Sequence, residues 1–142
     1  MMFVVAGGAV AHAMGMDLSS NFTLAAGTTN GQVTGPWAAR SGFPNTVFAS
    51  SKMVADGGTW TLNAKGTLTS GWSSATALQL FIMKNAAVFA TLSIGFSVSS
   101  ATLTPQAITL ASGDTVWLAY TTPIGATGTL AAGAANTFVY FS

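Results

Sequence analysis

The alternation of apolar and polar residues on both sides of Gly113-Asp114 constrains the fold of this chain most strongly. In residues 107–110 and again in residues 115–120, successive side chains point to opposite faces, as in an extended strand. Gly113 allows a positive φ and Asp114 can bond neighbouring amides, so the two residues predict a turn between two strands. No segment keeps a 3.6-residue apolar period across its Gly and Thr residues. The sequence therefore predicts an antiparallel all-β protein.

Further strands are predicted along most of the chain. The clearest alternation runs through residues 59–68, and similar patterns occupy residues 77–84, 88–98 and 137–141. Turn signals such as Asn30-Gly31 and the run at residues 56–58 separate these segments. About eight to ten short strands at this spacing are typical of a two-sheet sandwich or jelly roll.

Charge is scarce in this chain. Only 5% of its 142 residues are charged, against roughly 25% in an average soluble domain, while half are hydrophobic. Such a surface is poorly protected against association, so we expect an oligomer or a larger assembly. The net charge of +1 includes no Lys/Arg cluster, which argues against binding nucleic acid or an anionic membrane surface.

The residues needed for catalysis are almost missing from the composition. The chain has three Asp, no Glu, one His and no Cys. Asp56 and Asp114 both stand beside a Gly in a predicted turn, where a structural role is expected. No nucleophile elbow, phosphate loop, dinucleotide fingerprint or cluster of metal ligands is present. We therefore predict a protein that is no enzyme and has no cofactor and no metal site.

The N-terminal segment differs from the rest of the chain. Residues 1–16 carry no Asp, Glu, Lys or Arg. They resemble a short secretory signal peptide but lack its basic N-terminal region. The segment is too short, and too often interrupted by Gly, to span a membrane. We interpret residues 1–20 as an apolar arm that docks on its own oligomer or on a partner, and residues 21–142 as the β-domain. Deletion of residues 1–16 is then expected to leave this domain folded. The attachment candidates are Phe3, Val4, Val5 and Val10.

Two tryptophans are candidates for ligand stacking. Trp37 and Trp72 lie in predicted loops, whereas Trp60 follows a strand pattern and is expected in the core. A sugar-binding receptor module that uses Trp37 and Trp72 on a surface glycan is therefore an alternative to a purely structural protein.

Several motifs follow one another in an order found in a known family. Gly58-Thr59-Trp60 opens a strand, residues 81–85 end in Lys-Asn, residues 113–118 read Gly-Asp-Thr-Val-Trp-Leu, and residues 137–141 are rich in Phe. This order resembles the tumour-necrosis-factor-like (TNF-like) jelly roll, in the form of the globular head of the complement first component. Ala86 stands where the family usually has Gly, and no acidic cluster matches the calcium site of some members. The resemblance covers roughly residues 47–142.

The resemblance implies a compact homotrimer. Low-charge, Ala/Thr/Gly-rich versions also look like domains in virion proteins of tailed bacteriophages. The first hypothesis is therefore a trimer that decorates the capsid exterior and contacts the major capsid protein. A tail-tip or fibre-head trimer that contacts tail proteins is the alternative.

The closing strand supplies the candidate trimer contacts. Phe138 and Tyr140 point to one face, and Val139 and Phe141 to the other, with no polar face between them. In the resembling family one face of this strand packs on the core and the other on the threefold axis. We assign Phe138 and Tyr140 to the axis, because a phenol keeps its hydroxyl bonded at a subunit boundary more easily than in a core.

Overall fold

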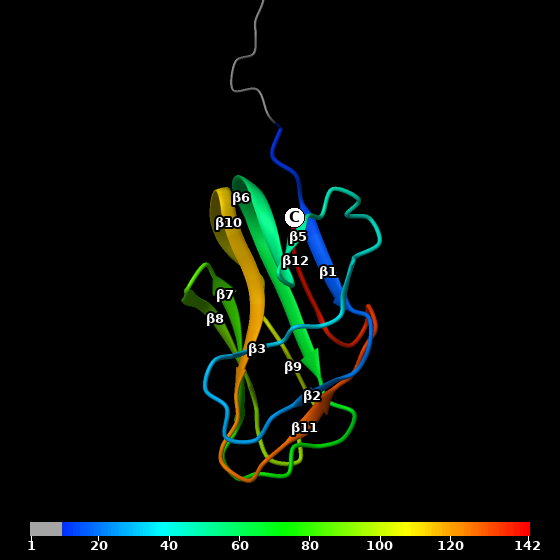
Figure 1. Cartoon of the computed structure of the whole chain (residues 1–142), viewed down its shortest axis with the longest axis vertical. Helices are drawn as coiled ribbons and strands as arrows, with labels where there is room; N and C mark the ends of the chain where they lie inside the picture. Colours follow the sequence, from blue (N-terminus) through cyan, green and yellow to red (C-terminus); the bar gives the residue numbers. More distant parts are fainter. Residues whose placement is uncertain (1–9) are drawn as a thin grey trace, which may run out of the picture.

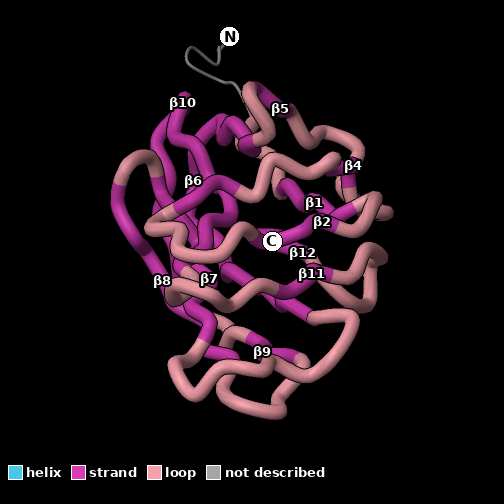
Figure 2. Tube along the Cα trace, turned by 60° about the horizontal axis from the view of Figure 1, so that its bottom comes forward, coloured by secondary structure: helices cyan, strands magenta, loops and turns pink. Residues whose placement is uncertain are grey.

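The protein is an antiparallel β-sandwich in the part that the structure describes. A computed structural model of the chain describes residues 10–142, which form twelve strands and no helix (Figures 1 and 2). The strands are β1 (Met14–Leu18), β2 (Phe22–Leu24), β3 (Gly31–Gln32), β4 (Trp37–Ala39), β5 (Phe48–Ala49), β6 (Lys52–Thr67), β7 (Leu78–Lys84), β8 (Ala87–Ile94), β9 (Ser100–Thr102), β10 (Gln106–Thr121), β11 (Gly128–Leu130) and β12 (Phe138–Phe141).

Most strands belong to one hydrogen-bonded sheet that folds over into two layers. Its order is β4-β1-β12-β6-β10-β7-β8, with β3 added to β10, β5 and β9 added to β6, and β2 paired with β11 in a small separate sheet. We call β4, β1, β12, the second half of β6 and the first half of β10 the terminal layer. The hairpin layer comprises β3, the second half of β10, β7 and β8. This architecture confirms the predicted two-sheet jelly roll.

Two long strands carry the chain from one layer to the other. β6 and β10 pair side by side, and both bend where Asp56 lies opposite Ser112, next to an irregular register between Ser112 and Thr115 (Figure 1). Gly113 has a φ of 93°, which suits glycine as predicted. The two halves of β10 do not fold back on each other, however. The first half pairs with β6. The second half continues this pairing at Thr115 and Val116 and pairs with β7 on its other side, so the predicted turn is a bend within one strand.

The core lies between the two layers. Leu62 and Ala64 of β6 and Val139 and Phe141 of β12 point inward from the terminal layer and are buried. The layers approach closely at Gly66, where an added Cβ would lie 2.3 Å from the Leu80 side chain of β7. The hairpin layer contributes buried apolar side chains at alternate positions: Leu78, Leu80, Ile82, Leu92, Ile94, Val116, Leu118 and Tyr120.

The N-terminal arm ends earlier than expected. β1 is a full member of the terminal layer, because it pairs with β12 on one side and with β4 on the other. Met14, Met16 and Leu18 are buried in the core. The boundary at residue 20 is therefore wrong, and the β-domain includes Met14–Leu18. Val10 is 71% exposed, and the other three attachment candidates lie outside the described residues.

The segment after β7 also departs from the predicted alternation. β8 ends at Ile94, and its register with β7 shifts between Ile82 and Met83, so that Val88 pairs with Met83. Val88 is consequently exposed. The exposed Phe96 and Val98 lie beyond the end of the strand.

Candidate functional site

Phe138 and Tyr140 lie on the outward face of the terminal layer. Val139 and Phe141 are fully buried on the opposite side of β12, whereas Phe138 and Tyr140 are half-buried. The two outward rings are neighbours, with centroids 5.7 Å apart. The predicted separation of this strand into a core pair and an outward pair is therefore what the structure has.

A cation lies over both outward rings. Arg40 follows β4, and its guanidinium carbon is 4.3 Å from the centroid of Phe138 and 4.9 Å from that of Tyr140. The same guanidinium donates hydrogen bonds to the carboxylate of Asp17 and, at 3.0 Å, to the carbonyl of Ala134. Arg40 thus combines an ion pair with two cation–π contacts, and this clamp holds the aromatic pair in place.

The backbone under this clamp requires a residue without a side chain. Gly15 of β1 pairs with Tyr140, and an added Cβ would lie 2.8 Å from the Tyr140 Cβ. Its amide donates to the Thr46 hydroxyl at 3.0 Å, which attaches the connection after β4 to the edge of the face. From that connection Phe43 contacts Tyr140, with ring centroids 5.3 Å apart. Tyr140 is therefore framed on two sides while part of it remains exposed.

The rest of the outward face carries small, mostly uncharged side chains. Thr59 and Thr61 of β6 pair with Thr109 and Ala107 of β10, and the two hydroxyls of Thr59 and Thr109 are 3.1 Å apart. All four side chains are exposed, and Asn63 continues the row beside Tyr140. The row ends at Lys65, which pairs with Phe138, and its Thr and Ala residues allow another protein surface to approach closely.

The two candidate stacking tryptophans do not form a platform. Trp72 is 1% exposed, and its indole donates to the carbonyl of Thr76 at 2.9 Å. Trp37 lies in β4, packs partly against the core and donates to the carbonyl of Val33 at 2.9 Å. The expected exposed pair is therefore wrong, because Trp72 is a core residue.

The acidic residues at the bends serve the fold. Asp56 accepts from the backbone amide of His12 at 2.8 Å and lies 2.5 Å from its ring nitrogen, and these hydrogen bonds lower the pKa of Asp56. A hydrogen bond from the Asn85 side chain, together with the Ala111 amide, likewise lowers the pKa of Asp114. Within residues 10–142 no group of three or more His, Asp, Cys or Glu side chains is placed to hold a metal ion.

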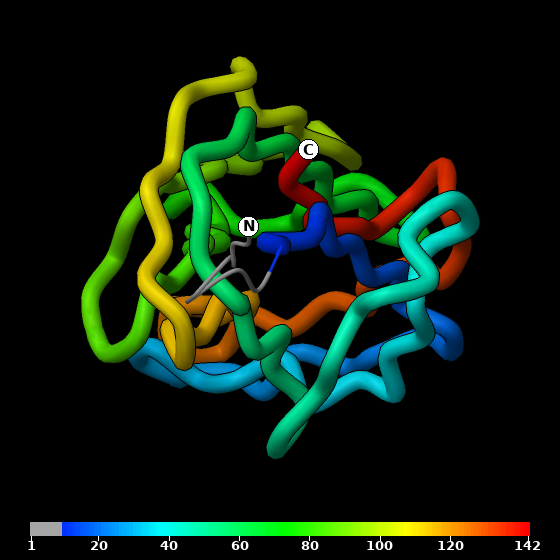
Figure 3. The backbone as a smooth tube through the Cα atoms, turned by 90° about the horizontal axis from the view of Figure 1, so that it is seen from above, coloured from blue at the N-terminus to red at the C-terminus, as the bar shows by residue number. Residues whose placement is uncertain are grey.

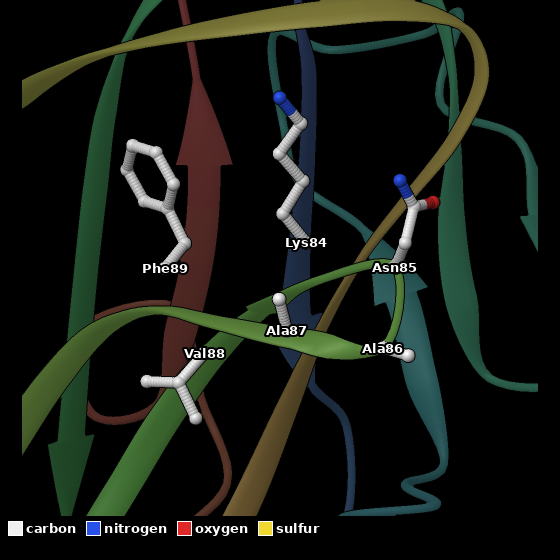
Figure 4. Close-up of a pocket in the computed structure, with 6 residues that line it drawn as sticks. All are labelled: Lys84, Asn85, Ala86, Ala87, Val88 and Phe89. Carbon is white, nitrogen blue, oxygen red and sulfur yellow. The ribbon is translucent and has the colours of Figure 1, made fainter.

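An apolar hollow lies at the end of the β7–β8 hairpin. It measures about 480 Å³. Figure 4 shows its lining residues, which are Lys84, Asn85, Ala86, Ala87, Val88 and Phe89. The Lys84-Asn85 pair indicates a hairpin turn and the residues after it are small and apolar, so the sequence contains no sign of a hollow here. No helix in residues 10–142 is long and apolar enough to cross a membrane.

Comparison with known proteins bears on the fold. No family model matches the sequence, and no curated protein matches it either. Among solved structures, the TNF protein Eiger from S. frugiperda superposes with a TM-score of 0.63, covering 92% of this chain and 90% of that chain. The fold is TNF-like. With 9% sequence identity, the likeness concerns the arrangement of the strands, which agrees with the resemblance in residues 47–142 and extends it toward the N-terminus.

The Arg40 clamp was not foreseen from the sequence of this TNF-like chain. Arg40 and Asp17 stand 23 residues apart in segments without a clear strand pattern, and the pairing of β4 with β1 brings them together. A search for isolated charges in a chain with so few of them would have picked out both residues, but not the contact of Arg40 with the two rings of β12.

Proposed function

We propose that this protein is a homotrimeric structural protein of a virion, without enzymatic activity, and that it decorates the capsid exterior of a tailed bacteriophage. One observation carries the proposal: an outward sheet face with two half-exposed aromatic rings beside a row of exposed Thr and Ala residues. Aromatic residues are enriched at the centres of protein interfaces, and charged residues are depleted there.

The scarcity of charge supports assembly as well. The described protein has an accessible surface of 6383 Å², and the whole chain has seven charged residues. Arg40 and Asp17, which are charged and lie at the aromatic face, neutralise each other, and Lys65, which pairs with Phe138, donates to the carbonyl of Ala135. Association through this face therefore desolvates few charges. The TNF-like fold supports a threefold arrangement, because domains of the resembling family form compact trimers.

The place in the virion follows from the resemblance to Ala/Thr/Gly-rich virion domains. A tail-tip or fibre-head trimer uses the same face and is distinguished only by its location. A glycan-binding role for the two tryptophans has lost its support, since Trp72 is buried.

Sedimentation of three variants tests the oligomer. Tyr140→Ala removes a contact at the centre of the proposed interface, where a loss of about 2 kcal/mol or more is typical of such residues. The variant should sediment as a monomer at low micromolar concentration and keep its β-type circular dichroism. Phe96→Ala removes a 65% exposed aromatic far from β12 in sequence and should leave the trimer intact. A trimer of undiminished strength in Tyr140→Ala, or a wild-type monomer, contradicts the proposed interface.

Imaging tests the location. Gold-labelled antibody against the protein should mark the capsid shell of particles at many sites. Label confined to the tail would replace decoration by the tail-tip alternative. Particles without label would remove the virion role.

A further inference from the structure

The hydrogen-bonded sheet ends at β8 with an unpaired strand edge. Within residues 10–142, β8 pairs with β7 alone, and no backbone hydrogen bond joins Ala87–Ile94 to another segment. These eight residues include no charged residue, no Pro and no Gly. The β7–β8 hairpin forms the outer side of the molecule in two perpendicular views (Figures 1 and 3). The free edge of β8 therefore offers a row of amides and carbonyls to another strand.

The other strands at the ends of the two layers are protected. β4 has three residues and β3 has two. Side chains bond the free edge of the first half of β10: Lys84 donates to the carbonyl of Thr109 at 2.7 Å, and the carboxylate of Asp114 accepts from the amide of Ala111 at 2.9 Å. Short strands and charged side chains at an edge are common protections against edge-to-edge pairing. β8 has neither of them, so it is the edge open to an added strand.

Two complementary apolar features lie at the two ends of this edge. The hollow of about 480 Å³ lies at the beginning of β8, where residues 86–88 are exposed (Figure 4). Just beyond the other end, Phe96 is 65% exposed in a turn that the hydrogen bond from the Val98 amide to the Gly95 carbonyl closes at 3.0 Å. Burial of such a ring against methyl groups is favourable. Each copy of the chain thus carries both halves of an apolar contact with another copy.

We propose that β8 pairs antiparallel with β8 of a second copy, about a twofold axis at Thr91. Residues that lie opposite each other in an antiparallel pair point to the same face of the sheet. With the axis at Thr91, this exposed residue lies opposite its own copy, and the buried Ala90 lies opposite the buried Leu92. The core side of one copy therefore continues into the core side of the other, and two threonine hydroxyls meet on the outside.

The same register brings the ring to the hollow. Ile94 lies opposite Val88 of the second copy, so the irregular part of β8, where its pairing with β7 shifts, stays at the end of the new pair. Two residues beyond Ile94, Phe96 then reaches the hairpin tip that contains the hollow of the second copy. Because the contact is isologous, the dimer contains two such placements of Phe96.

A second copy suits this edge because no charge opposes it. Ala87–Ile94 is uncharged, and Lys84, which lines the hollow, is bonded to Thr109 and lies 4.0 Å from Asp114 of its own chain. The contact is small, because eight strand residues extend over about 27 Å. We therefore expect a dissociation constant of about 100 µM, so that single subunits stay apart at low micromolar concentration. The inference goes beyond the proposed function and does not depend on it, since the proposed trimer face belongs to the terminal layer and β8 to the hairpin layer.

Disulfide trapping tests the pairing and its register, because the natural chain has no Cys. The test protein is the full chain with Thr91→Cys, and the control carries Ser93→Cys, which is also exposed on β8. The two thiols at position 91 lie on adjacent strands within reach of a disulfide. Those at position 93 are four residues apart along the strands, about 13 Å, which is too far. Mild oxidation at about 100 µM protein should give dimers of doubled mass about tenfold faster with Thr91→Cys than with Ser93→Cys.

A second substitution tests the role of Phe96. Phe96→Ser added to Thr91→Cys should slow trapping severalfold, whereas Ile124→Ser, at an apolar position that is 95% exposed in the loop after β10, should leave the rate unchanged. An undiminished rate with Phe96→Ser would show that the ring does not occupy the hollow. Equal rates for Thr91→Cys and Ser93→Cys, or no linked dimer, would overturn the pairing itself. Trapping should persist when Tyr140→Ala is added, which separates this result from the success or failure of the proposed trimer.

Discussion

Removal of the first sixteen residues should unfold this protein, whereas removal of the first nine should not. The sequence pattern alone predicted that removal of residues 1–16 would leave the β-domain folded. In the structure, residues 10–13 precede the domain and Met14 begins β1, the strand between β4 and β12. Deleting residues 1–16 therefore removes most of a central strand and leaves β4 without its neighbour.

The expected loss follows from two buried side chains. Met14 is 1% exposed and Met16 is fully buried. Replacing one buried Met by Ala typically costs about 2–5 kcal/mol. Losing both thus lowers the free energy of unfolding by about 4–10 kcal/mol before the hydrogen bonds to β12 and β4 are considered. Because domains of this size have total stabilities of about 5–15 kcal/mol, the truncated chain should be largely unfolded.

Urea titration followed by circular dichroism measures the effect. The deletion of residues 1–9 should unfold cooperatively, like the full chain, and the deletion of residues 1–16 should show no transition. Full-length Met16→Ala should lie between them, with a loss of about 2–5 kcal/mol. If the longer deletion unfolds with the same midpoint as the shorter one, β1 contributes nothing to the fold and the reasoning fails.

Three further changes should have measurable effects. Asp56→Asn removes a carboxylate whose pKa is lowered by its hydrogen bonds from His12. The wild type should therefore exceed the variant in free energy of unfolding by the full amount above about pH 5, and this difference should shrink as the pH falls below 3.8. A difference that grows toward acid pH would contradict this. Gly66→Ala should lower the free energy of unfolding by about 1–3 kcal/mol in a urea titration, because its Cβ would meet a buried leucine. Trp72→Ala should cost about 3–5 kcal/mol in the same assay, and an unchanged midpoint would mean that this side chain is not part of the core.

The fold class and the faces of the regular strands were predictable from the sequence. The period of two in β6 and β12 depends only on the extended backbone, so it places Val139 and Phe141 on one side and Phe138 and Tyr140 on the other wherever the strand lies. The absence of a helical period is a local property of the same kind. The choice of the pair that faces the core rested on the hydroxyl of Tyr140, because both pairs are apolar enough to be buried.

The tertiary structure decided the features that depend on which strands meet. Met14–Leu18 reads as part of an apolar arm, and becomes a central strand only because β12, more than 100 residues later, pairs with it. Gly113 allows a hairpin and a bend equally well by its positive φ. The pairing of β6 with β10 on both sides of Gly113 selects the bend. The Arg40 clamp and the hairpin hollow arise in the same way, because local patterns set the face of a side chain whereas distant strands determine what covers it.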